Sequence, residues 1–312
     1  AHGDYYRADK GDLRIIVRQD APIKGKVAIA TGGGSGHLPV FMGYVGKGLA
    51  DGACIGNVFS SPSAGQMKRV TKAIDGGAGV LYLYGRYQGD MMNFNSAAEE
   101  SIKNGIRVES VIVSDDVASA PPERHSERRG VAGIFFAYKI AGAMANEMAS
   151  LDEVKRVTQK AVDNTRSLGI ALGPCTIPLV GKPNFEISDD EMEIGMGIHG
   201  EQGVERVKMR TADEIAATLV DRVVNDMPFV AGDEVAVLVN SLGATPLEEL
   251  YVLYRKIDEL LREKGLVLHR PYVGRYACSM EMQGMSLSLM KLDDELKRLL
   301  DAPADSPFFK QF

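Results

Sequence analysis

The sequence has few of the residues and patterns that build disulfide frameworks, metal knuckles or membrane spans. Its three cysteines, Cys54, Cys175 and Cys278, stand far apart and form no C-x-x-C pair. This excludes a disulfide scaffold and a zinc knuckle and favours a reducing compartment. No apolar run has the length of a membrane span, because Lys139 interrupts the most apolar segment, residues 131–145. We therefore expect a cytoplasmic protein that binds no membrane.

Positive charge is also in short supply. The 36 Lys and Arg residues are outnumbered by 42 Asp and Glu residues, which gives a formal net charge of −6. This balance argues against nucleic acid or an anionic membrane surface as the main partner. No signal peptide opens the chain, which begins without methionine and so leaves open whether residues precede it. With 312 residues, 45% of them hydrophobic, the chain is long enough for two domains with substantial cores.

Apolar, β-branched runs alternate with helical patterns along the whole chain. Such alternation predicts an α/β fold in which largely parallel or mixed sheets are covered by helices. A polar stretch at 163–167 suggests two α/β domains, residues 1–165 and 166–312. Capping boxes predict helix starts at Ser150, Thr211 and Thr245. The expected strands cover 13–17, 26–30, 80–85, 108–113, 235–240, 265–269 and 286–292, and the expected helical regions cover 96–104, 131–165, 212–225 and 246–264.

A glycine-rich stretch, TGGGSGH at residues 31–37, follows the second expected strand. Glycine loses more conformational entropy on folding than other residues and has no side chain to pack. So many glycines together indicate either a plain turn or a ligand that lies against the backbone. A dinucleotide fingerprint fails, because its third glycine would fall on His37 or Pro39. The P-loop and nucleophile-elbow patterns fail as well. The glycine-rich stretch therefore ends in His37 and matches none of these three common glycine motifs.

A second histidine, His199, also lies among glycines, in EIGMGIHGEQG. If this segment is a strand, Glu193, Gly195, Gly197 and His199 share one face, and the two glycines leave open space beside the imidazole. The alternative is a core histidine satisfied by hydrogen bonds. No histidines are paired at metal-ligand spacing, so the sequence predicts no metal site.

Several charged residues follow the expected strands. Asp90 lies in YGRYQGDMMNF, in an expected loop beyond strand 80–85, where α/β sheets place ligand sites. Asp115 and Asp116 follow strand 108–113 in the same way. For all three, a solvated turn or a helix cap is the alternative. Arg128 and Arg129 could clamp an anion, but a solvated basic patch is the favoured interpretation.

An ordered series of segments, from about residue 20 to the C-terminus, resembles the K (ketose-binding) subunit of the dihydroxyacetone kinase family. The segments are GGGSGH, GYVGKG, NVFSSPS, YQGDMMNF, RRGVAG, KIAGA, GPCTIP, GKPNFE, DEMEIGMGIHGE, NSLGATPLEELY and MKLDDEL. Each is weak by itself, whereas the ordered set covers more than nine-tenths of the chain and is highly specific.

The resemblance implies a two-domain α/β subunit that binds a short ketose and forms a homodimer. His199 is expected to add to the ketose carbonyl and give a hemiaminal, which excludes polyols such as glycerol. Asp90 is expected to accept the proton of the attacking terminal hydroxyl, with help from His37. The backbone near Gly34 and Ser35 is expected to meet the substrate hydroxyls, so that the ligand fills the space that side chains would take.

The resemblance also implies that the nucleotide is bound by a different subunit or domain. No nucleotide or phosphate cradle appears in the sequence, whereas phosphoryl transfer needs one, usually with magnesium. In this family a separate L subunit or fused L domain holds the nucleotide through magnesium. We therefore expect this chain to bind no cofactor and no metal and to be inactive alone. Whether the ultimate donor is ATP or phosphoenolpyruvate stays open.

Three positions depart from the family's common pattern: Leu38, Arg86 and Pro174. Leu38 and Arg86 lie close to the expected binding residues and put the identity of the ketose in doubt, with erythrulose as an alternative to dihydroxyacetone. A relative that senses ketose for a transcriptional regulator is a second alternative. Retention of His37, Asp90 and His199 together favours catalysis, because sensing needs capture alone. The failed fingerprints disfavour a dehydrogenase.

Overall fold

The computed structural model describes residues 1–312, which fold as α/β structure in two compact units. The first unit comprises Ala1–Val113, Ile134–Asp163 and Asp294–Phe312, and the second comprises Ser114–Gly133 and Asn164–Asp293. The chain crosses between them at the polar stretch near residue 165 and at three further points. Residues 114–133, predicted in the N-terminal domain, belong to the second unit, and residues 294–312, predicted in the C-terminal domain, belong to the first.

The first unit is built on a six-stranded mixed sheet. Strands β4, β3, β5 and β6 run parallel, whereas β2 pairs antiparallel with β4 and β1 antiparallel with β2. Because β4 and β5 flank β3 on opposite sides, the carboxyl ends of the three strands meet at one edge, where open α/β sheets bind ligands. The strands, in sheet order, are β1 (Tyr6–Asp9), β2 (Asp12–Arg18), β4 (Gly52–Val58), β3 (Ala28–Ser35), β5 (Val80–Gly85) and β6 (Val108–Val113).

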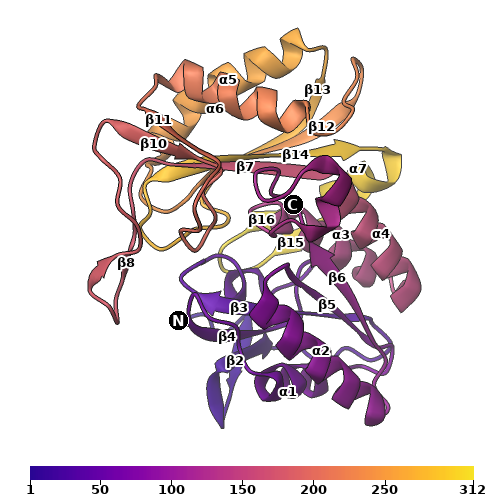
Figure 1. Cartoon of the computed structure of the whole chain (residues 1–312). Coiled ribbons are helices and arrows are strands. Elements are labelled where there is room, and N and C mark those ends of the chain that lie inside the picture. The colour runs from indigo at the N-terminus through magenta and orange to yellow at the C-terminus, as the bar shows by residue number, and fades with distance from the viewer. The chain divides into compact units, whose positions relative to one another are not determined.

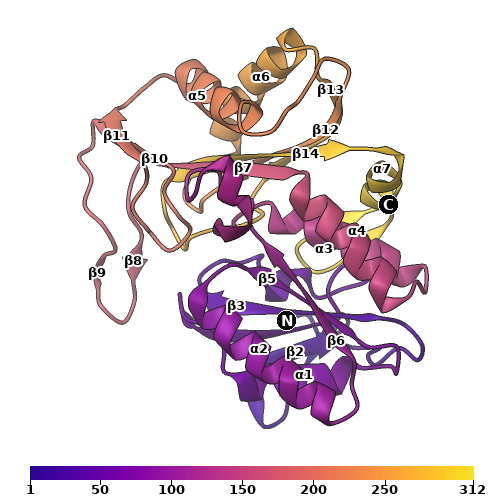
Figure 2. The same cartoon turned by 45° about the vertical axis from the view of Figure 1, so that its right-hand side comes forward.

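Helices cover both faces of this sheet. Helices α1 (Ala64–Ile74) and α2 (Gln88–Lys103) pack together on one face, and α3 (Ile134–Asn146) and α4 (Leu151–Asp163) lie on the other (Figure 2). Side chains from β5 alternate between the two layers. Thus Tyr82 and Tyr84 join the core under α1 and α2. A short 3-10 turn (Met42–Tyr44), helix α7 (Asp294–Asp301) and the small hairpin of β15 (Ala304–Asp305) and β16 (Lys310–Gln311) complete the unit.

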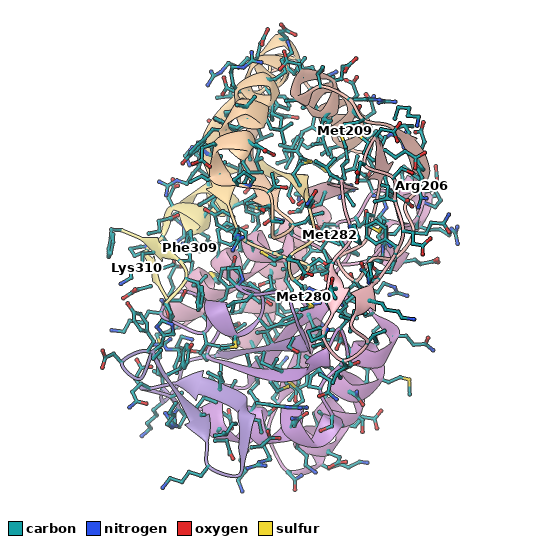
Figure 3. The ribbon with its side chains drawn as sticks, turned by 90° about the vertical axis from the view of Figure 1, so that its left-hand side faces the viewer. Arg206, Met209, Met280, Met282, Phe309 and Lys310 are labelled. Atoms are coloured by element: carbon teal, nitrogen blue, oxygen red, sulfur yellow. The ribbon has the colours of Figure 1, made fainter.

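Helix α3 is buried on nearly all sides, which explains its almost continuous apolar sequence. Lys139 is also fully buried there. Its ammonium group donates to the carbonyl of Ala302 and lies 5.9 Å from the centroid of the Phe309 ring, which is labelled in Figure 3. The lysine thus joins α3 to the C-terminal segment of the same unit. No helix of the chain combines the length and apolar character that crossing a bilayer requires.

A close backbone approach on α3 gives a first prediction. A Cβ on Gly142 would lie 2.3 Å from the carbonyl carbon and oxygen of Gly48, whereas a Cβ on Gly65 in α1 would meet only one atom, at 3.9 Å. Backbone cannot move aside as a side-chain tip can, so Gly142→Ala should lower the free energy of unfolding by about 3 kcal/mol. Gly65→Ala should instead raise it by up to about 1 kcal/mol, because alanine favours the helix.

Urea denaturation of the two variants tests this prediction directly. Equal midpoints for the variants at 142 and 65 would show that α3 does not approach residue 48 as closely as described.

The second unit has a six-stranded sheet that is mainly antiparallel, with only β12 and β13 parallel. One parallel pair among antiparallel strands makes this a mixed sheet, which agrees with the predicted largely parallel or mixed sheets covered by helices. Helices α5 (Ala212–Val224) and α6 (Leu247–Glu263) pack side by side over one face (Figure 1). The strands, in sheet order, are β11 (Glu205–Lys208), β10 (Glu191–Ile194), β7 (Thr165–Ala171), β14 (Gly284–Leu292), β12 (Glu234–Ser241) and β13 (Val267–Gly274). A small hairpin of β8 (Thr176–Ile177) and β9 (Lys182–Pro183) and a 3-10 segment (Pro122–Glu127) complete the unit.

Two of the predicted capping boxes have different outcomes. The box that starts α5 is confirmed: the Thr211 hydroxyl accepts from the amide of Glu214, whose carboxylate accepts from the amide of Thr211. The box at Thr245 is wrong. Its hydroxyl donates to the carbonyl of Gly284 at 2.7 Å and accepts from the same residue's amide at 2.9 Å, and Pro246 is the N-cap of α6. Thr245 thus joins the start of α6 to β14.

Candidate active site

The glycine-rich stretch lies at the carboxyl end of β3, where Gly32, Gly33 and Gly34 continue the strand instead of forming a loop. A Cβ on Gly33 would lie 2.1 Å from the ring of Phe41, and one on Gly34 would lie 2.6 Å from the amide nitrogen of Ser60. Protein atoms therefore occupy the space beside these two glycines. These protein atoms suffice to explain the two glycines, and contact between the substrate and the backbone near Gly34 and Ser35 stays a prediction.

His37 follows directly after this strand end. It is 1% exposed, and its imidazole stacks on Phe59 with ring centroids 5.1 Å apart and planes 22° apart. Phe41 contacts the same imidazole edge-on, at 6.3 Å and 87°. The two aromatic rings fix the plane of His37 at the carboxyl end of the sheet, next to the backbone of Gly34 and Ser35.

Asp90 lies in the first turn of α2, because this helix begins at Gln88 and not near residue 96 as predicted. The expected loop position is therefore a helix N-terminus, whose dipole favours a carboxylate. The side chain is 7% exposed. Asn93 donates to Pro62 at 2.8 Å and to Ser61 at 3.2 Å, so the segment after β4 holds the start of α2.

His199 lies in the loop that joins the antiparallel strands β10 and β11. The strand predicted through residue 199 is wrong beyond Ile194, since Gly195 has φ +83° and leaves the sheet. The amide of Val204 returns to the carbonyl of Ile194 at 2.9 Å and closes the loop. Gly197 is required for close approach: a Cβ there would lie 2.1 Å from Glu201 Oε2 and 2.7 Å from Arg129 Nη1.

Glu201 is the partner of His199. Its Oε1 lies 3.0 Å from His199 Nδ1, and its Oε2 accepts from the backbone amide of His199 at 2.9 Å. Burial tends to raise the pKa of Glu201, but the hydrogen bond and charge of His199 outweigh burial and lower that pKa to about 2. The His199 side chain remains 21% exposed, so the ring is held on one edge and is accessible.

Charged residues expected to be solvated are instead buried or half-buried in this unit. Arg129 donates to Asp116 at 2.8 Å and to the carbonyl of Gly195 at 3.0 Å, and burial raises the pKa of Asp116 to about 6 although Arg129 is adjacent. Fully buried Arg128 makes a bidentate pair with Asp226, with both distances 2.6 Å. The predicted solvated basic patch at 128–129 is therefore wrong.

Asp115 is also buried, and its carboxylate accepts from the amides of Val131 and Gly133, each at 2.8 Å. The solvated-turn alternative is thus wrong for Asp115 and for Asp116. Both aspartates organise the segment that carries Arg129.

The predicted site residues fall into two groups. Gly34, Ser35, His37 and Asp90 belong to the first unit, at the carboxyl ends of β3 and β5, and His199 belongs to the second. Their catalytic roles stay predictions. Sequence reasoning missed Glu201 and did not predict that Arg129 pairs with Asp116. The sequence did contain a signal for Glu201. It follows His199 by two residues with Gly200 between them, and a chain that turns at this glycine can bring the carboxylate back to the imidazole.

Comparison with known proteins gives consistent matches over the whole chain. The sequence is 47% identical over 310 residues to the PTS-dependent dihydroxyacetone kinase 2, dihydroxyacetone-binding subunit DhaK, of Listeria innocua, covering 99% of this chain and 93% of that one. It is 46% identical over 296 residues to the D-erythrulose kinase of Mycolicibacterium smegmatis, covering 95% of this chain and 51% of that kinase. The solved structure of the dihydroxyacetone kinase operon co-activator Dha-DhaQ superposes with a TM-score of 0.90 at 31% identity, covering 96% and 92% of the two chains.

The match to a protein-family model is equally extensive. Residues 1–308 fit the Dak1 domain. The ordered motifs, the α/β units and these relatives agree, and the chain belongs to the Dak1 domain family of dihydroxyacetone kinase proteins.

Proposed function

We propose that this chain is the substrate-holding subunit of a kinase for short ketoses. His199 captures the ketose carbonyl as a hemiaminal, and a nucleotide-bearing partner phosphorylates the terminal hydroxyl of the captured ketose. The observation that carries the proposal is the accessible imidazole of His199, bound through Nδ1 to Glu201, in a chain 47% identical to a dihydroxyacetone-binding subunit.

The chemistry follows from the residue types. A neutral imidazole has a nitrogen lone pair that can attack a carbonyl carbon, whereas glycerol has no carbonyl and escapes capture. We assign Asp90 as the base that accepts the proton of the attacking hydroxyl. His37, held between Phe41 and Phe59, hydrogen-bonds the substrate and assists that transfer.

A partner must supply the phosphoryl group. The D-erythrulose kinase of M. smegmatis carries a further half with no counterpart in this chain, since the match covers 51% of it. We infer that an L subunit holds nucleotide and magnesium and that this subunit works with it as a homodimer. ATP and phosphoenolpyruvate remain the candidate donors.

Reconstitution tests this proposal. This chain, a purified L subunit and the two together are incubated with ketose and a phosphoryl donor, and ketose phosphate is measured. Only the mixture should form product, and glycerol should not be phosphorylated. Product from this chain alone would contradict the need for a partner.

A ketose sensor is the second candidate, because the co-activator superposes at a TM-score of 0.90. Sensing requires capture alone, so a sensor would bind ketose and form no product in the reconstituted mixture. The buried carboxylate of Asp90, placed at a helix N-terminus, favours catalysis over sensing.

Arg86 gives a prediction about the choice of ketose. It is half-buried between β5 and α2, four residues before Asp90, and its amide is fixed to Val113 at 3.1 Å. A guanidinium there offers a planar set of donors to an additional hydroxyl. A site built to bind a hydroxyl discriminates against analogues that lack it. We therefore expect a higher kcat/KM for erythrulose than for dihydroxyacetone, and Arg86→Asn should reduce that ratio.

Parallel kinetics with both ketoses in the reconstituted kinase provide the measurement. A wild-type preference for dihydroxyacetone that Arg86→Asn leaves unchanged would refute the assignment of Arg86.

A further inference from the structure

The carboxylate of Glu201 uses both of its oxygens on a single residue. One oxygen contacts the imidazole of His199 at Nδ1 (3.0 Å), and the other accepts from that residue's backbone amide at 2.9 Å. The carbonyl of Glu201 also accepts from the amide of Gly197 at 3.0 Å. Residues 197–201 therefore form a closed set of hydrogen bonds around one edge of the imidazole.

This contact determines where the ring proton lies. With its pKa lowered to about 2, Glu201 is ionised at any pH at which the protein works, and an ionised carboxylate only accepts hydrogen bonds. Nδ1 must therefore carry the proton that forms the 3.0 Å contact. A neutral imidazole has one N–H, so the lone pair lies on Nε2.

We propose that Glu201 is a positioning residue that fixes His199 as the Nδ1–H tautomer and provides the counter-charge for the covalent adduct. This inference rests on the proposed capture of ketose by His199. The nucleophilic atom is Nε2, on the side of the ring opposite the atom that Glu201 binds.

The step balances as follows. The Nε2 lone pair forms a bond to the carbonyl carbon, and the π electrons of C=O move to the oxygen. This oxygen takes a proton from water, which leaves as hydroxide into the solvent. The ring keeps its Nδ1 proton and becomes a substituted imidazolium, with its positive charge beside the carboxylate of Glu201. No oxidant or reductant is needed.

A second charged side chain, Arg129, lies close to Glu201. A Cβ at residue 197 would clash with both Glu201 Oε2 and Arg129 Nη1, so both side chains lie against the same glycine. Arg129 is itself fixed by Asp116 and by the carbonyl of Gly195. Two charged side chains, Glu201 and Arg129, thus lie together against Gly197 in the loop that carries His199.

The test uses Glu201→Gln. A glutamine has one acceptor oxygen and one donor NH₂ group, so it cannot accept from both the backbone amide and Nδ1–H. If the oxygen keeps the amide, the NH₂ group faces Nδ1 and favours the Nε2–H tautomer, which removes the nucleophilic lone pair. Adduct formation should slow about 10- to 100-fold, the usual effect of losing a group that orients a reactive histidine.

Two measurements separate this inference from the proposed function. Nitrogen-15 NMR of histidine-labelled full-length protein, at a pH where the ring is neutral, reports the tautomer of His199 without any ketose; the signal is assigned with His199→Ala. Carbon-13 NMR with carbonyl-labelled dihydroxyacetone reports the adduct. Glu186→Gln makes the same chemical change on an exposed residue of the same unit and should alter neither reading.

The expected result is an Nδ1–H tautomer in the wild type, a shift toward Nε2–H in Glu201→Gln, and partial recovery in Glu201→Asp. An Nε2–H tautomer in the wild type would overturn the inference even if no variant folds. Adduct formation at the wild-type rate in folded Glu201→Gln would overturn it and leave capture intact. An Nδ1–H tautomer in a wild type that forms no adduct would refute the proposed function but would agree with the tautomer assignment.

Discussion

Replacing Asp90 with asparagine is expected to leave ketose capture intact and to lower turnover of the reconstituted kinase about 10²- to 10⁴-fold, the usual contribution of a general base. Asparagine keeps the size and shape of the side chain, but it replaces one acceptor oxygen with an NH₂ donor and cannot take a proton. Asp90 is buried in the first turn of α2, and asparagine has nearly the same shape, so the substitution should not disturb the packing there.

A matched control is available in the first turn of α4. Asp152→Asn makes the same chemical change on a side chain that is 68% exposed, and it should leave turnover unchanged. Adduct formation by the Asp90 variant, measured without the partner, verifies that the site is intact. Near-normal turnover in the Asp90 variant would assign the proton transfer to another group.

Replacing His199 with alanine should abolish capture and lower kcat/KM on the order of 10³-fold or more, since the substrate is no longer held in the reacting geometry. The loop should persist, because its closing bond runs between the backbones of Ile194 and Val204. His125→Ala, in the 3-10 segment of the same unit, is the control and should behave as wild type. Turnover by the His199 variant close to wild type would show that the ketose is held without a covalent bond.

Part of the fold could be predicted from the sequence because local patterns determine it. The apolar run at 80–85 forms β5 as expected, and the Thr211 hydroxyl and the Glu214 carboxylate form their capping box. The apolar runs at 235–240 and 286–292 likewise form β12 and β14. In each case the deciding contacts lie within a few residues or on one face of a strand.

The site loop could not be predicted in the same way. Alternation from Glu193 to His199 resembles a strand, but Gly195 adopts a positive φ and ends the strand pairing, and the alternation of residue types does not show this. Arg128 and Asp226 lie 98 residues apart, so their buried ion pair has no local signal. The ring of Phe41 explains Gly33, and the backbone of Phe59 and Ser60 explains Gly34. Only the folded chain brings these atoms together.

The central claim is covalent capture by His199, and one measurement tests it most directly. Dihydroxyacetone labelled with carbon-13 at its carbonyl carbon is added to the wild-type protein and to His199→Ala, and the labelled carbon is followed by NMR. We predict that the wild type converts the carbonyl signal into that of a saturated carbon bonded to nitrogen, in one-to-one stoichiometry, and that the variant gives no such signal. A carbonyl carbon that stays unsaturated in the wild type, or an adduct that persists in His199→Ala, would contradict the account.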